Sequence, residues 1–573
     1  MNKFNSKLWL GNGIFWIIFC FCLAWVSVVP VIAVGDAAEA AVPGSKSLPD
    51  ITDTDWQKNV RVTEAIFIDE KERTNKKLSL QQCIERTLHH NLDIRFGGKT
   101  PAIQMSEIIR AEAAFDAVLF ANMQFVNTDK AELDTGFFTQ TIATDSGTKT
   151  VKIPTDPFNR NHDDNYSLGL RKRLPTGASI ELAESLRRLR ILTDDGDDLF
   201  RNPFYQYAIQ LRLRQPLLRD FGIDLNRASI LAARNNFRIS QKQFERLIIE
   251  TLVNVERNYW RLVFARQRVK IFEDLHRRAR QTLERVLERK DHDASSLAVA
   301  RADAETEKAR ANWISSRTDV LQQQDLLLQS MNDPHMSLEE KWEIIPVDIP
   351  TFSVFDLDYE TALRTALKMR PEIAEQKLRI DTAHIVKGVA KNQKLPRLDL
   401  FAEQEVTGAG DESHNAWDQQ WSHETITSTI GLSFEIPLGN RAAEAAYGKA
   451  RLELEQEKIG LKNTQEQIRA DVNIALHNLK NIYKEISARR KAVEKDRDEV
   501  LTYLAIQETE RQDSVTPSFL NLKLNADNRL ANSQVSAMQT ILEYNLAIMD
   551  AHRAQGLLLR YNNVKLAESS GTK

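Results

Sequence analysis

Few residues in this sequence stand at spacings that support catalysis or metal binding. His89, His90 and His292 first suggest a metal site, but no further ligand lies at a known metal-binding spacing and no His-Glu-x-x-His motif occurs. The sequence also has no glycine-rich phosphate loop, nucleophile elbow or Cys-x-x-Cys pair. We therefore expect no enzyme activity, no metal site and no cofactor, and we interpret these histidines as surface residues.

Acidic side chains instead gather at two breaks between long helical patterns. Asp291 and Asp293 lie in the first break, the segment KDHDA, and Asp513 opens the second. Carboxylates at such turns have two interpretations. They cap the neighbouring helices and face water, or, if several copies surround an axis, they form a ring that selects and gates cations.

The N-terminus has the layout of a secretory signal peptide. Two lysines precede an apolar run from Ile14 to Val29, and small residues follow at candidate cleavage sites. An uncleaved anchor is the alternative, because the run can be counted from Leu8 to Val34. Removal of this segment leaves Cys83 as the only cysteine, which excludes an intramolecular disulfide.

Strict alternation of apolar and polar residues predicts strands at Tyr205–Arg214 and Thr425–Ile436. Alternation over ~10 residues is what a transmembrane barrel strand requires, although a half-buried strand of a soluble sandwich alternates in the same way. The export signal, and the lack of a later apolar run of ~20 residues, favour the membrane. The positions that we expect to face lipid are Tyr205, Tyr207, Ile209, Leu211, Leu213, Ile430, Leu432 and Phe434.

Long helical patterns with heptad spacing follow the strands, as expected for helices packed side by side as coiled coils. The first, Leu225–Asp291, is ~100 Å long at 1.5 Å per residue. The second is Arg441–Gln512, and each is followed by a turn and a returning helix. A half-length helix precedes the strands of each half, at Ser79–Ala114 and at Asp358–Lys394. The order helix, strands, very long helix, turn, helix therefore occurs twice.

Short phrases recur in the same order in both halves. Gln215-Pro216-Leu217 and Ile436-Pro437-Leu438 close the strand regions, and the stretches SSLAVARADAE and TPSFLNLKLNAD begin the returning helices. MRPE, at Met369–Glu372, opens the helix that leads to Leu395-Pro396-Arg397-Leu398. With these features, residues 78–562 resemble the TolC-type outer-membrane efflux protein family.

The resemblance implies a mainly α fold with a transmembrane β portion, in which a homotrimer closes one shared β-barrel in the outer membrane and one helical tunnel across the periplasm. It implies a passive channel subunit of a tripartite efflux or type I secretion system, with a periplasmic adaptor protein and an inner-membrane pump as partners. The near balance of 77 basic and 80 acidic residues gives no bulk attraction for nucleic acid. The alternative is a periplasmic coiled-coil adaptor or structural protein without a membrane barrel.

At the periplasmic tip of such a trimer, the candidate pore gate is Asp291, Asp293 and Asp513. The candidate adaptor-docking residues, which flank the same turns, are Ser295, Leu297, Thr516 and Leu520.

We predict a signal peptide at 1–40, an N-terminal extension at 41–77, a first repeat at 78–357, a second repeat at 358–562 and a C-terminal tail at 563–573, with tips near 290–294 and 512–517. The first repeat carries extra material, a predicted hairpin at 165–186 that turns at Pro175-Thr176-Gly177. The family's usual pattern is two strands per repeat. The hairpin widens the barrel, folds over its outer mouth or lies outside the lipid, and the sequence leaves all three open.

Overall fold

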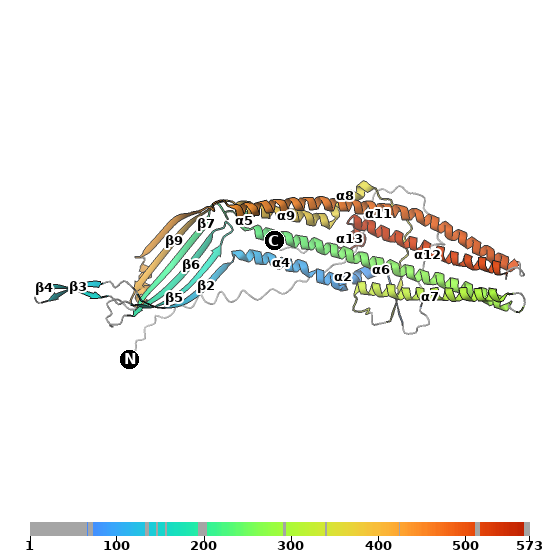
Figure 1. Cartoon of the computed structure of the whole chain (residues 1–573), viewed down its shortest axis with the longest axis horizontal. Coiled ribbons are helices and arrows are strands. Elements are labelled where there is room, and N and C mark those ends of the chain that lie inside the picture. The colour runs from blue at the N-terminus through green and yellow to red at the C-terminus, as the bar shows by residue number, and fades with distance from the viewer. Residues whose placement is uncertain are drawn as a thin grey trace, which may run out of the picture.

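A computed structural model gives an elongated molecule, with a strand region at one end and helices along the rest of its length (Figure 1). The signal peptide, His292, Asp293 and Asp513 lie outside the residues that the structure describes. Those residues are 66, 73–131, 137–144, 147–154, 158–192, 203–289, 291, 294–337, 341–422, 424–509 and 516–565.

Six strands form one antiparallel sheet in the order β10–β9–β7–β6–β5–β2. Strand β7 of the first half pairs with β9 of the second, so the sheet joins the two halves of the chain. The extra hairpin is β5–β6, and it lies inside this sheet between β2 and β7. The strands are β2 Ala117–Ala131, β5 Phe158–Arg173, β6 Ser179–Leu192, β7 Phe204–Pro216, β9 Arg397–Gly410 and β10 Ile426–Glu435.

Two short strand pairs stand apart from this sheet, and the sequence patterns do not predict either. Strands β3 (Phe137–Thr144) and β4 (Gly147–Pro154) form a hairpin that extends beyond the far end of the sheet (Figure 1). Strands β1 (Thr74–Leu78) and β8 (Trp342–Pro346) pair in parallel and lie against the helices.

Helices lie four abreast along the rest of the molecule. Next to the sheet, α4, α6, α9 and α11 pack in that order, and towards the tip the order is α7, α6, α12 and α11. Two very long helices, α6 and α11, therefore run the whole length, and shorter helices share the remaining places. The bounds are α4 Lys99–Glu112, α6 Ala228–Glu288, α7 Ser296–Met331, α9 Pro371–Asn392, α11 Arg441–Thr509 and α12 Pro517–Ala554.

The two half-length helices predicted as continuous are each broken, so those predictions are wrong in detail. The first divides at Asn91 into α2 (Leu80–His90) and α3 (Leu92–Gly97), and α4 follows. The second divides at Arg370, between α8 (Tyr359–Met369) and α9. Asn91 and Arg370 have almost the same extended backbone, with ψ of 127° and 129°. Arg370 precedes a proline, which disfavours helical ψ, and Asn91 caps α3 by accepting a hydrogen bond from the Ile94 amide.

The remaining elements are short. A 3-10 turn leads from α4 into β2, α5 precedes α6, α10 lies between β9 and β10, and α13 follows α12. Their bounds are Ala113–Phe115 for the turn, Ile223–Asn226 for α5, Ser413–Ser422 for α10 and Leu558–Tyr561 for α13.

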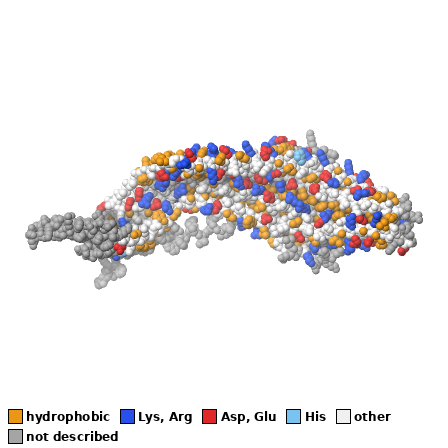
Figure 2. Space-filling view, viewed as in Figure 1, with side chains coloured by type: hydrophobic (Ala, Val, Ile, Leu, Met, Phe, Trp, Pro, Cys, Tyr) orange, Lys and Arg blue, Asp and Glu red, His pale blue; other side chains and the backbone are white. Residues whose placement is uncertain are grey.

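The core consists of apolar seams between neighbouring helices. The largest cluster lies where β1 and β8 meet α6, and it contains the fully buried Leu78, Tyr259, Leu262 and Ile344. On the outside, acidic and basic side chains are interspersed along the visible face of the helical body (Figure 2). The helices are therefore held together by narrow seams, and much of their surface is polar.

Candidate functional site

One face of the six-stranded sheet is apolar and exposed. The positions that the sequence predicts to face lipid all lie on this face, because paired residues of neighbouring strands point to the same side. Ile430, Leu432 and Phe434 on β10 are 79%, 64% and 62% exposed. A continuous apolar surface of this kind is unusual for a protein surrounded by water.

The register extends this apolar face across the strands of the extra hairpin. Leu211 of β7 pairs with Leu182 of β6, which pairs with Leu170 of β5, which in turn pairs with Leu119 of β2. These four leucines form a row across the sheet, and each is between 45% and 71% exposed. At this level of the sheet, the hairpin thus continues the apolar face of its neighbours without a change of side.

The opposite face of the sheet is polar and carries ion pairs between strands. Arg212 of β7 donates to Glu403 of β9 at 2.8 Å and lies 3.6 Å from Glu181 of β6. Closer to the helices, Arg214 and Arg397 both donate to the largely buried carboxylate of Asp399, at 2.6 and 2.8 Å. Such pairs keep the charges balanced while leaving the polar face hydrated.

Two glycines on this polar face are covered by aromatic rings. A Cβ at Gly169 would lie 2.5 Å from the Phe120 ring, and one at Gly431 would lie 2.4 Å from the Phe401 ring. Each phenylalanine is the cross-strand partner of its glycine. Only glycine leaves room for the ring to lie flat over the partner strand, so these pairs help to fix the register.

Helix α10 packs on the apolar face at the end of the sheet far from the helical body. Its backbone lies so close to β9 that a Cβ at Gly408 would come within 2.1 Å of the Ala416 carbonyl oxygen. Tyr207 and Ser413 share a hydroxyl hydrogen bond of 2.9 Å, and the Tyr207 ring meets Trp417 edge to face. Exposed Trp417 and Trp421 therefore border the apolar face, where interfacial aromatic side chains occur in membrane barrels.

At the opposite end of the molecule, the structure separates the predicted tip residues into different environments. Asp291 is exposed at the α6–α7 turn, and Leu297 is 53% exposed on α7. Ser295 and Thr516 are N-caps, accepting hydrogen bonds from the amides of the third residues of α7 and α12. Leu520 is only 2% exposed and packs among Val286, Ala298 and Leu524, so in this conformation it presents no surface to a partner.

A buried polar contact near the tip joins the two helical hairpins, and sequence reasoning missed it. On α12, Lys523 donates to Thr282 of α6 at 2.7 Å, and Asp527 accepts from Arg278 of α6 at 2.8 Å. Burial lowers the pKa of Lys523 and raises that of Asp527. The sequence signal for Asp527 was its spacing: Leu520, Leu524, Asp527 and Ala531 recur at intervals of four, three and four, which places Asp527 in the apolar seam of α12.

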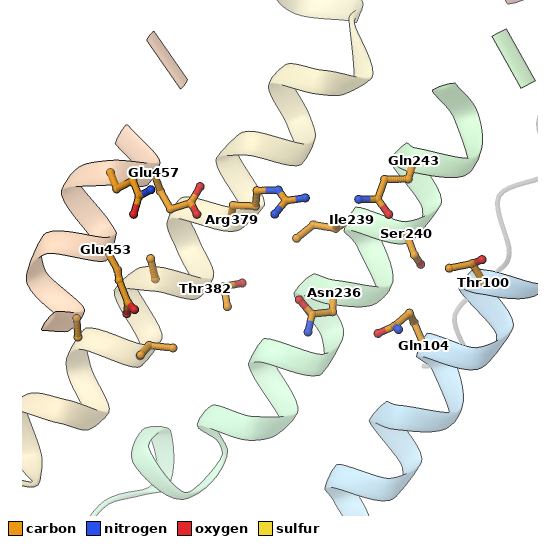
Figure 3. A pocket seen from close by; sticks show the side chains of 14 residues that line it. Thr100, Gln104, Asn236, Ile239, Ser240, Gln243, Arg379, Thr382, Glu453 and Glu457 are labelled. Carbon is orange, nitrogen blue, oxygen red and sulfur yellow. The ribbon is translucent and has the colours of Figure 1, made fainter. Parts of the chain in front are cut away.

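A polar groove of about 570 Å³ crosses the four helices next to the sheet (Figure 3). Gln104 of α4, Asn236 and Gln243 of α6, Arg379 of α9 and Glu453 of α11 line it. Gln243 and Arg379 both donate to Glu375, at 2.9 and 2.7 Å. This part of the helical layer therefore presents hydrogen-bonding groups to water.

None of the helices in the described part of the chain is long and apolar enough to span a membrane. Among the same residues, no group of three or more His, Cys, Asp or Glu side chains is placed to hold a metal ion.

Comparison with protein families matches residues 173–333 to the family described as "Outer membrane efflux protein". The matched segment runs from the end of β5 through β6, β7, α6 and α7, and so includes part of the sheet and the first long hairpin. The predicted resemblance to the outer-membrane efflux proteins is confirmed. Comparison with curated proteins finds no match.

Solved outer-membrane channels have a similar fold. The Campylobacter jejuni CmeC outer membrane channel aligns with a TM-score of 0.57 and 13% identity, over 94% of this chain and 96% of its own. CusC aligns with a TM-score of 0.58 and 14% identity, over 83% of this chain and 92% of its own. The open-state Neisseria gonorrhoeae MtrE channel gives 0.56 and 16%, over 84% and 89%. At these identities the likeness shows that this chain shares the fold of outer-membrane efflux channels.

Proposed function

We propose that this chain is one subunit of a homotrimeric duct that carries cargo passively across the outer membrane and the periplasm. The observation that carries this proposal is the six-stranded sheet, which has one exposed apolar face, one charged face and two open edges. The residues predicted to face lipid keep that role, and the ion-paired face lines an aqueous bore.

The edges of the sheet supply the reason for assembly. Within the described part of the chain, β2 and β10 each pair on one side only. Unpaired backbone groups are very costly in a bilayer, so a membrane sheet must close on itself. Pairing of β10 in one copy with β2 in the next closes the barrel, and the number of three copies comes from the family resemblance.

The helices offer matching surfaces at the same two borders. Helix α4 leads into β2, and its Ile103 and Ile109 are 59% and 55% exposed. Helix α11 follows β10, and its Leu452 and Ile459 are 60% and 67% exposed. Contact of α11 with α4 of the next copy would bury both apolar stripes, and it would carry the ring of the barrel into a helical tunnel.

The tip is the proposed docking end for a periplasmic adaptor, which connects the duct to an inner-membrane pump. Exposed Asp291 is a proposed gate residue there, together with Asp293 and Asp513, and the exposed members of the proposed docking set are Ser295, Leu297 and Thr516. The alternative, a periplasmic adaptor without a barrel, leaves the exposed apolar face of the sheet without a role.

Chemical cross-linking between copies tests the proposal. A chain with Leu119→Cys on β2 and Leu432→Cys on β10 is expected to give covalent trimers in outer membranes when treated with a flexible bifunctional thiol reagent. A control chain with Leu119→Cys and Ile209→Cys has its second cysteine on the central strand β7 and should stay monomeric on a denaturing gel. A protein found as a monomer in the soluble periplasmic fraction would overturn the proposal.

A further inference from the structure

We propose that the β5–β6 hairpin widens the membrane pore, so that the barrel is as wide as the helical tunnel and passes cargo up to the size of a folded helical hairpin. The inference rests on the proposed trimer. Three copies of the six-stranded sheet give a barrel of 18 strands, whereas two strands per repeat would give 12.

The pairing of the hairpin shows that it is a full part of the sheet. Strand β5 pairs with β2 along the whole of Ala117–Ala131, and β6 pairs with both β5 and β7. A hairpin folded over the mouth of a barrel, or lying outside the lipid, would leave β2 to pair directly with β7. Here β2 and β7 are separated by both strands of the hairpin.

In its part nearer the helices, both faces of the hairpin match those of its neighbours, whereas farther out Glu184 and the Asp164–Arg188 ion pair lie on the same face as the leucines. Leu168, Leu170 and Leu182 are 56%, 46% and 49% exposed on the apolar face. Ser167 and Ser185, which pair with each other, lie on the polar face. Beside the helices the hairpin therefore has the lipid-facing and water-facing sides that a barrel strand needs.

The hairpin also brings the width of the sheet close to the width of the helical layer. Strands about 4.8 Å apart and tilted by about 40° each occupy about 6.3 Å of a barrel's circumference, so six occupy about 38 Å. The four helices beside the sheet occupy about 36 Å at an interaxial distance of about 9 Å. Four strands would cover only about 25 Å. When the hairpin is included, the sheet and the helical layer that adjoins it have almost equal widths.

This match sets the bore of the duct. An 18-stranded barrel built in this way has a backbone diameter of about 36 Å, and about 26 Å remains open after side chains of about 5 Å on each side. A 12-stranded barrel of the same geometry leaves only about 14 Å. Two helices packed side by side are about 20 Å wide, so the wider barrel admits them and the narrower one excludes them. The periplasmic tip, rather than the barrel, then limits the size of the cargo.

Thiol labelling from outside the cell tests this inference. Ser179→Cys places a thiol on the polar face of β6 near the helical end of the sheet, and Leu182→Cys places one on the apolar face of the same strand. Membrane-impermeant maleimide polymers are used in graded sizes, from below the about 14 Å bore to above the about 26 Å bore. We expect Ser179→Cys to react with polymers of about 20 Å, and Leu182→Cys to stay unlabelled by any of them.

Two results overturn the inference: reaction of Ser179→Cys with the smallest polymers only, or equal labelling of both variants. Electron microscopy of the purified protein in lipid nanodiscs gives an independent count, and 12 strands around the barrel would also overturn it. A protein that forms no trimer in the outer membrane contradicts the proposed function instead. The gel used for cross-linking detects that outcome separately.

Discussion

Replacing Glu343 by alanine would remove the carboxylate that neutralises Arg266 in the interior of the helical body. Both side chains are 1% exposed. Arg266 of α6 donates to Glu343 of β8 at 2.9 Å and to the Ile344 carbonyl at 3.2 Å. Glu343 also accepts a hydrogen bond from the Ile66 amide at 2.7 Å. The Arg266–Glu343 ion pair thus links the β1–β8 sheet to helix α6.

The magnitude follows from the burial of both charges. Removing one partner of a buried ion pair destabilises a protein by about 3–5 kcal/mol, because the remaining charge stays in a medium of low polarity. Burial already lowers the pKa of Arg266, which shows how poorly the site solvates a cation. Replacing both residues by apolar ones of similar size removes both desolvation costs and is often close to neutral. We therefore expect Glu343→Ala to cost about 4 kcal/mol and Arg266→Met with Glu343→Leu much less.

Amide hydrogen exchange measures the effect where it acts, which is useful because membrane trimers often unfold irreversibly. A loss of about 4 kcal/mol corresponds to roughly thousandfold faster exchange in Thr74–Leu78 and Trp342–Pro346, if these strands open together. Protection of α12 near the tip serves as the internal control. If the single and double variants lose equal protection, the side chains act through packing rather than charge and the reasoning is refuted.

Three further predictions concern the sheet and the helices. Ile430→Arg on the apolar face should lower the stability of the sheet in the membrane by about 2–4 kcal/mol and deplete the proposed trimer in outer membranes, whereas Thr429→Arg on the polar face should not. Gly431→Val should displace the Phe401 ring and cost about 1–3 kcal/mol, measured as a lower dissociation temperature of the trimer, with partial rescue by Phe401→Ala. Burial lowers the pKa of His552 to about 4, so the unfolded chain binds this proton first and stability should fall as pH drops from 6.5 towards 4. Amide hydrogen exchange in α12, corrected for the intrinsic pH dependence of exchange, gives the opening free energy of this helix at pH 7.5 and at pH 4.5. The decrease between the two pH values should be smaller in His552→Phe than in the native chain by about 2–3 kcal/mol, and an equal decrease would contradict the assignment.

The sheet was the part of the fold most readable from the sequence. Period-two alternation at Tyr205–Arg214 identifies β7 to within a few residues and assigns each side chain to a face, because a strand has only two faces. The place of the extra hairpin was not readable. A strand alternates in the same way inside a barrel or outside it, and only the partners on either side decide the question.

The helices were predicted in type and approximate length but not in their interruptions. Proline after Arg370 is a visible signal for the break, whereas Asn91 carries a signal only when the two halves are aligned. At the tip, Leu520 was predicted to contact a partner because of its place beside a turn, yet it packs against α6 and α7. Exposure near a turn depends on which neighbouring helix covers the position, and heptad spacing alone does not identify that neighbour.

The pairing of β7 with β9 has a consequence for the order in which the molecule forms. These strands are joined by about 180 residues of chain, whose closure costs about 5 kcal/mol of conformational entropy before any contact is made. The first repeat can therefore bring β2, β5, β6 and β7 together on its own, but the outer edge of β7 stays unpaired until the second repeat supplies β9. Long-range pairings of this kind form slowly, so the exposed edge of β7 is the part of the folding sheet that remains open to wrong partners for longest.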